Sequence, residues 1–307
     1  MSLQTEKVLK ELSAIIDAHE EGFNSEKDLD ALIQKFLEEK NAKASFGAAN
    51  FEPETADDYL ELADETDSRK ERLEYLNKAL ALEPDNLDAM RMKATLTTKH
   101  FHEFLEELSK LLKKGTRQME KEGFFADDCR GNFWGIVETR PYMRLRHAYM
   151  RTLMECRMLR RAAEECEEML ALCEDDNLGV RYDLMHLYAM LEEEKPARAV
   201  MEKFHSEKET QMLLPFSILH FKLGHMDEAL SALKRLSRVN KDTKKFLKAM
   251  MSEDIENVFP EMSPYGYRAS CIEELFVEIS SYPFLFENAF PYFDWAYQAL
   301  KKRPAKK

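Results

Sequence analysis

The cysteines of this chain could in principle bind a metal or attack a substrate, but their spacing does not build such a site. Cys156, Cys166 and Cys173 lie 10 and 7 residues apart, whereas a compact zinc motif pairs cysteines only a few residues apart. The chain has five cysteines and no CxxC pair. Free cysteines otherwise behave as small hydrophobic side chains, so the sequence predicts reduced, buried thiols.

The histidines do not predict a metal site either. His100 and His102 are two residues apart, and on a helix they would point in different directions. His186, His220 and His225 show no paired ligand spacing. The chain also lacks a nucleophile elbow, a phosphate loop and a fixed pair of catalytic carboxylates. The sequence therefore predicts a protein that is not an enzyme and that carries no catalytic residue, metal ion or cofactor.

Arginine is concentrated in one segment of an otherwise acidic chain. Between residues 140 and 161 lie seven arginines, namely Arg140, Arg144, Arg146, Arg151, Arg157, Arg160 and Arg161. Guanidinium groups bind carboxylates and phosphates in a planar, two-pronged way, so one interpretation is a clamp for an anion or an acidic peptide. The alternative is that neighbouring acids pair with the arginines on solvated helix faces, the candidates being Glu164, Glu165, Glu167 and Glu168.

The first two of these arginines, Arg140 and Arg144, lie at the end of an unusual connecting segment, GNFWGIVETRPYMR at 131–144. Pro141 suits the first turn of a helix, with Thr139 as its N-cap. A less favoured hypothesis for the whole protein is an enzyme whose active site lies in the connecting segment 116–143.

Two interpretations of this connection remain open. In the functional one, Trp134 and Tyr142 line the entrance of a ligand site where Arg140 and Arg144 bind a carboxylate. In the structural one, Trp134 fills a gap between helices, while Glu138 or a helix C-terminus satisfies Arg140.

The elements that must position these residues are helices that recur along the chain. Related phrases occur at 71–86 (ERLEYLNKALALEPDN), 162–177 (AAEECEEMLALCEDDN) and 223–240 (LGHMDEALSALKRLSRVN). They resemble the second helix of a tetratricopeptide repeat. Small residues at equivalent places, Ala163, Ala199 and Ala229, are 36 and 30 residues apart, on either side of the usual 34.

The predicted fold is therefore all-α, a tetratricopeptide-type helical repeat superhelix, or α-solenoid. We expect helix pairs at about 55–84, 87–114, 142–174, 179–205 and 208–238, with Gly115 as a C-cap. The expected organisation is a helical hairpin at 1–40, a linker at 41–54, repeats at 55–240, a helical aromatic cap at 241–300 and a basic disordered tail at 301–307.

In such repeats the first helix of each pair lines the concave surface. The positions expected there are Leu145, Tyr149, Thr152, Arg181, Leu184, Tyr188, Gln211, Leu214, Ile218 and Phe221. This groove could hold an amphipathic helix or an extended peptide. Equally, the protein's own aromatic segment at 282–297 could cover it.

Composition limits the classes of partner. The net charge of −13 disfavours sequence-independent binding to nucleic acid. The chain has no run of about 18 apolar residues, which predicts no membrane span, and its acidic N-terminal segment does not resemble a signal peptide. A cytoplasmic location is expected. The 17 methionines mostly fit helix-packing positions.

Two phrases carry a closer resemblance. FWGIVETRPYMR at 133–144 and DNLGVRY at 176–182 resemble signature phrases of a family of uncharacterised bacterial tetratricopeptide-like proteins. The chain is more distantly similar to the suppressor-of-tumorigenicity-7-like proteins, which have a helical repeat layout. The resemblance covers about residues 55–270 and implies a helical repeat fold without an assigned catalytic activity.

The sequence thus predicts a non-enzymatic adaptor or scaffold that binds a peptide or protein segment in a repeat groove. The alternative is a regulatory sensor whose arginines bind a small peptide or an anionic ligand. The residues expected to take part are Trp134, Arg140, Tyr142, Arg144, Tyr149, Arg181, Tyr188 and Phe221.

Overall fold

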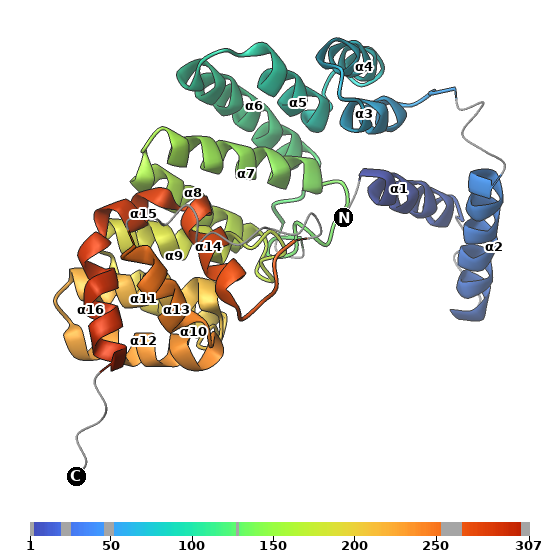
Figure 1. Ribbon diagram of the computed structural model, residues 1–307. Coiled ribbons are helices and arrows are strands. Elements are labelled where there is room, and N and C mark those ends of the chain that lie inside the picture. The colour runs from blue at the N-terminus through green and yellow to red at the C-terminus, as the bar shows by residue number, and fades with distance from the viewer. Residues whose placement is uncertain (1–2, 20–25, 46–51, 127–128, 253–265, 302–307) are drawn as a thin grey trace. The chain divides into compact units, whose positions relative to one another are not determined.

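A computed structural model describes residues 3–19, 26–45, 52–126, 129–252 and 266–301 (Figure 1). Every regular element in these ranges is a helix, and two isolated bridges join Gly131 and Asn132 to Cys173. The prediction of an all-α protein is confirmed. The chain divides into two compact units, one made of residues 1–157 and 171–175 and the other of 158–170 and 176–307.

The first unit contains seven helices in its described residues. They are α1 (Leu3–Asp17), α2 (Glu26–Ser45), α3 (Ala56–Glu65), α4 (Arg69–Leu82), α5 (Leu87–Thr97), α6 (Phe101–Lys121) and α7 (Arg140–Glu155). Helix α2 continues through Ser45, so residues 41–45 of the expected linker are helical. Residues 46–51 of that linker lie outside the described residues.

Local sequence explains why α3, α4 and α5 begin where they do. The Thr55 hydroxyl accepts from the backbone N–H of Asp58, whose carboxylate accepts from that of Thr55, a complete capping box. The side chains of Ser68 and Asn86 cap the next two helices by accepting from the N–H groups of Glu71 and Ala89. Helices α3 and α4 then pack through buried apolar residues, among them the small residue Ala79.

The sequence suggested that Gly115 ends a helix, but α6 continues past it to Lys121. Its role is packing. A Cβ atom at Gly115 would lie 2.9 Å from Cδ2 of Tyr142 on α7, closer than real carbon contacts. The missing side chain therefore allows α6 and α7 to approach each other.

The second unit contains most of α8 (Leu159–Leu172) and all later described helices. These are α9 (Val180–Leu191), α10 (Glu194–Lys203), α11 (Thr210–Lys222), α12 (Met226–Val239), α13 (Thr243–Met250), α14 (Ile272–Ser281), α15 (Pro283–Asn288) and α16 (Phe290–Lys301). Neighbours in sequence pack together, as α9 with α10 and α11 with α12.

One residue of the proposed repeat register is wrong. Ala199 is exposed, whereas Ala197 is fully buried on the same helix. With Ala197 in its place, the small buried residues Ala163, Ala197 and Ala229 are 34 and 32 residues apart. The spacing is therefore more regular than the sequence suggested.

The aromatic segment near the C-terminus folds back on this unit. Helix α15 packs on α9, and α16 packs on α12 and α13 (Figure 1). Tyr292 and Phe293 are fully buried, and the Tyr292 hydroxyl donates to Ser217 Oγ at 2.8 Å. The two prolines of this segment, Pro283 and Pro291, stand in the first turns of α15 and α16, where proline is tolerated. Of the disordered basic tail expected at 301–307, Lys301 instead ends α16, and residues 302–307 lie outside the described residues.

Candidate functional site

Arg144 does bind carboxylates, but they belong to its own chain. Its Nη1 donates to Glu6 Oε1 at 2.7 Å, and its Nε donates to Asp88 Oδ1 at 2.9 Å. Both carboxylates are buried. Burial disfavours the charge on Arg144, but its hydrogen bonds to Asp88 and Glu6 outweigh this effect and raise the pKa of the guanidinium. This arginine therefore joins α1, α5 and α7.

Arg140 has partners other than those expected from the sequence. Its Nε donates to the carbonyl oxygen of Trp134 at 2.8 Å, and its Nη1 lies 3.6 Å from Glu6 Oε1. The guanidinium also lies 5.6 Å from the centre of the half-buried Trp134 ring. Glu138, the partner proposed from the sequence, is exposed. The connection is thus held to α7 by its own backbone.

Tyr142 is a core residue with a satisfied hydroxyl group. Its side chain is 1% exposed and its ring packs against Phe133. The hydroxyl lies 2.9 Å from Thr116 Oγ1 and accepts from Arg146 Nη1 at 3.0 Å. Tyr149, on the same helix, is also buried. Neither side chain is presented to solvent as a ligand contact.

Thr139 occupies the N-cap position of α7, as expected, but its side chain does not cap the helix. Its hydroxyl donates backward, to the carbonyl oxygens of Phe133 and of Ile136. The phrase FWGIVET therefore folds on itself, with Phe133 fully buried. In this part of the chain the unusual sequence builds a rigid connection.

A hollow of the first unit lies along α4, α5 and α6, away from these residues. It has a volume of about 540 Å³ and an apolar lining from Leu80, Met90, Ala94 and Leu111. Its polar lining consists of Lys93, Thr97, Thr98, Glu103, Glu106, Glu107 and Lys110. The sequence showed no signal for this hollow, because its residues come from three helices with ordinary repeat-like sequences.

In the second unit Arg181 is also paired within the chain. Its Nη1 donates to Asp176 Oδ2 at 2.8 Å, and its guanidinium stacks 4.2 Å from the Tyr182 ring. Asp176 also caps α9, accepting the backbone N–H groups of Val180 and Arg181. Burial raises the pKa of Tyr182 to about 12. The DNLGVRY phrase therefore has a structural role as a helix start.

Tyr188 and Phe221 are covered by the chain itself. The Tyr188 hydroxyl donates to Glu167 Oε1 at 2.7 Å, and burial together with this bond raises the pKa of the phenol. The Phe221 ring packs against Tyr292 at 5.6 Å and Trp295 at 5.2 Å between ring centres. At Phe221 the aromatic segment 282–297 thus occupies the place that a bound peptide was expected to take.

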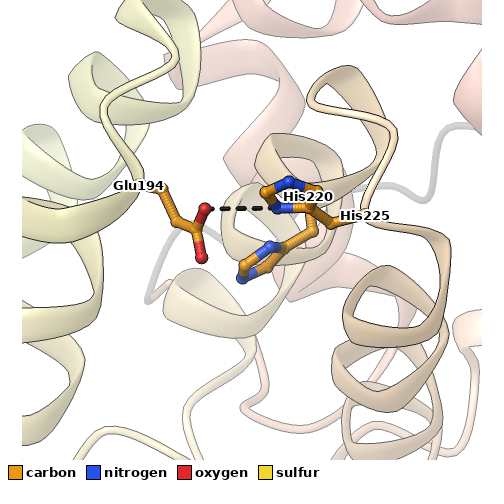
Figure 2. Close-up of side chains that lie close together, drawn as sticks. All are labelled: Glu194, His220 and His225. Carbon is orange, nitrogen blue, oxygen red and sulfur yellow. Dashed lines mark ion pairs between the residues drawn. The ribbon is translucent and has the colours of Figure 1, made fainter.

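The structure assembles one group that the sequence did not indicate. Glu194 on α10, His220 on α11 and His225 before α12 place their ligand atoms within 4.8 Å of one another (Figure 2). His225 Nδ1 lies 3.2 Å from Glu194 Oε2. His220 is fully buried, and neither ring nitrogen has a hydrogen-bond partner among the described residues. Burial lowers the pKa of His220, which favours its neutral form.

A second buried histidine, His186, has clear partners. Its Nδ1 donates to the carbonyl oxygen of Tyr182 at 2.7 Å, and its Nε2 lies 3.1 Å from Glu278 Oε1. Its ring stacks on that of Tyr282, 3.6 Å between centres. Burial, with the nearby charge of Glu274, raises the pKa of Glu278 well above its ordinary value. This pair is part of the packing of α9 on the C-terminal helices.

The fold and these sites define an all-α protein in which Arg140, Arg144 and Arg181 pair with carboxylates of the same chain. Comparison of the chain with models of known protein families and with curated protein sequences gave no match. Among the described residues, no helix combines the length and apolar character that crossing a bilayer requires.

Proposed function

We propose that this protein is a non-enzymatic cytoplasmic scaffold of tetratricopeptide-like helix pairs, which binds a segment of a partner protein. The observation that carries the proposal is the hollow along α4, α5 and α6. Its volume of about 540 Å³ and its mixed lining suit a few side chains of an amphipathic helix.

The charges around the hollow favour a basic partner. Three glutamates and two lysines line it, and the chain as a whole is acidic. Apolar anchors would fill the space beside Met90 and Ala94, while basic side chains would pair with the glutamates. We therefore expect a short amphipathic segment with leucine or methionine anchors and flanking lysines or arginines.

Site-specific photo-crosslinking tests this assignment. A photoreactive residue replaces Lys93, which lines the hollow, or Lys70, which is exposed on α4. We expect adducts specific to position 93 in extracts of the cells that make the protein. A peptide spanning the adduct should then bind the purified protein, and the charge reversal Glu106→Lys with Glu107→Lys should weaken binding about tenfold or more. Equal adducts at both positions, or binding unaffected by the reversal, would contradict the proposal.

A second candidate is the sensor of an anionic ligand. Its support is that Arg140 and Arg144 both contact the carboxylate of Glu6, an interaction that an acidic ligand could replace. An acidic ligand that replaced Glu6 would release α1. We then expect acidic peptides or phosphate to bind Glu6→Gln more tightly than the wild type. Thermal unfolding that no such ligand shifts in either protein would exclude this candidate.

A further inference from the structure

We propose that Glu194, His220 and His225 form a binding site for a divalent transition-metal ion of the zinc type. Imidazole nitrogens and carboxylate oxygens are the ligands that such ions take in proteins. The three residues come from consecutive elements of one unit, and Figure 2 shows their side chains converging on a common point.

His220 is the residue that indicates a ligand. A buried imidazole normally has partners for both ring nitrogens, one as donor and one as acceptor. His220 is 0% exposed, yet within the described part of the chain both its nitrogens lack a hydrogen-bond partner. The ring of Phe216 meets it edge-on at 4.5 Å and provides no polar atom for it. A metal ion would satisfy one nitrogen, as imidazole coordination requires the neutral ring.

The backbone turn after α11 brings the second histidine to the first. The N–H of His225 donates to the carbonyl oxygen of His220 at 2.9 Å, and that of Gly224 donates to Phe221 at 3.0 Å. These two bonds form a Schellman motif, which requires a left-handed residue, here Gly224 with φ of +76°. A spacing of five residues, unfavourable for two ligands on one helix, thereby becomes a pair of adjacent imidazoles.

Glu194 provides the third ligand in a suitable orientation. Its Oε1 accepts from Arg198 Nη2 at 2.8 Å, while its Oε2 faces His225. A hydrogen bond from a neighbouring side chain, here Arg198, orients a carboxylate that binds a metal ion. In a tetrahedral zinc site the ligand atoms lie roughly 3.4 Å apart. The ligand atoms of these three residues now lie within 4.8 Å of one another, so they must move closer together to bind the ion. Glu194 and His225 are partly exposed and can rotate to do so. Water would take the fourth position.

The site is testable on the full, untagged protein after treatment with a chelator. We expect Zn²⁺ titrated by calorimetry to bind one ion per chain, and Co²⁺ to give the visible absorption bands of tetrahedral coordination. The variants His225→Ala and Glu194→Gln change partly exposed side chains, so both should fold. Each should weaken Zn²⁺ binding about tenfold or more. Their matched controls, His205→Ala and Glu202→Gln, change exposed residues close by and should bind as the wild type does.

Thermal unfolding provides an independent readout. Zn²⁺ should raise the unfolding midpoint of the wild type and of both controls, because the ion binds only the folded site. The rise should be lost in His225→Ala. Equal Zn²⁺ affinity in the wild type, both variants and both controls would overturn the proposal. So would tetrahedral Co²⁺ bands that persist in a protein carrying both His225→Ala and Glu194→Gln.

Discussion

The backbone N–H of His225 donates to the carbonyl oxygen of His220 at 2.9 Å, so one hydrogen bond both closes α11 and places two imidazoles side by side. Gly224 immediately precedes His225 in this turn, and its φ of +76° suits glycine far better than any other residue. Helix termination and the candidate metal site therefore depend on the same turn.

Replacing Gly224 by alanine tests this dependence. Apart from its chain neighbours, no described residue has a heavy atom within 4 Å of a Cβ placed at Gly224, so the substitution changes mainly the backbone preference. We expect a loss of about 1 kcal/mol in the free energy of unfolding together with weaker Zn²⁺ binding. The control is Gly123→Ala, at a φ of +81° with equally open surroundings. It should lose similar stability, measured by urea unfolding, and leave Zn²⁺ binding unchanged.

Replacing Gly115 by alanine should lower the stability of the protein, whereas the same replacement of an ordinary helical glycine raises it. Alanine normally stabilises a helix interior by about 1 kcal/mol relative to glycine. Here the new methyl group would meet the Tyr142 ring at 2.9 Å, and we expect Gly115→Ala to destabilise by about 1–3 kcal/mol. Combining it with Tyr142→Leu should recover part of that loss. Additive effects of the two substitutions in urea unfolding would show that the two helices are not in close contact there.

Arg144 should be far more important for stability than a surface arginine. Arg144→Met leaves the carboxylates of Glu6 and Asp88 buried without their main cation, and we expect a loss of about 3–5 kcal/mol. The exposed pair of Arg160 with Glu193 provides the control, because Arg160→Met should cost less than about 1 kcal/mol. Similar losses for both variants in urea unfolding would contradict the structural role of Arg144.

The pH dependence of this ion-pair cluster has a definite sign. Burial tends to raise the pKa of Asp88, but hydrogen bonding and charge attraction from Arg144 outweigh it and lower that pKa. A carboxyl group with a depressed pKa in the folded state stabilises the protein above its ordinary value of 3.8, and loses that contribution as the pH falls. Asp88→Asn should therefore reduce stability at neutral pH and reduce the loss of stability on acidification.

Glu278 should show the opposite dependence. Its pKa is raised by burial, and Glu274 adds a repulsion. A carboxyl group with a raised pKa stabilises the fold most below its ordinary value of 4.5, and this stability is lost as the pH rises through the folded-state pKa. The titratable groups near it include His186 and Glu274. We expect Glu278→Gln to be less sensitive to pH between about 5 and 8 than the wild type.

Urea unfolding across that pH range measures the effect. The control is Glu287→Gln on α15, an exposed position where the same substitution should leave the pH profile of the wild type unchanged. A Glu278→Gln profile parallel to that of the wild type would show that Glu278 does not change its protonation state on folding.

Much of the fold could be predicted because it depends on short-range patterns. Thr55, Ser68 and Asn86 cap helices with their own neighbours' N–H groups, so their effect is visible in a few residues of sequence. Gly115 shows the limit of such reasoning. A glycine near a helix end and a glycine at a close helix contact have the same local signature, and only the position of Tyr142 separates them.

The candidate sites depended on contacts between distant residues. The sequence by itself determined the helical elements, the unusual arginine content of 140–161 and the aromatic content of 282–297. Only the tertiary structure decided that Glu6 and Asp88 pair with Arg144, and that Trp295 covers Phe221. It alone also brought Glu194 to the two histidines of the turn. The reason is physical: periodicity determines which side chains share a helix face, whereas helix packing determines which faces meet.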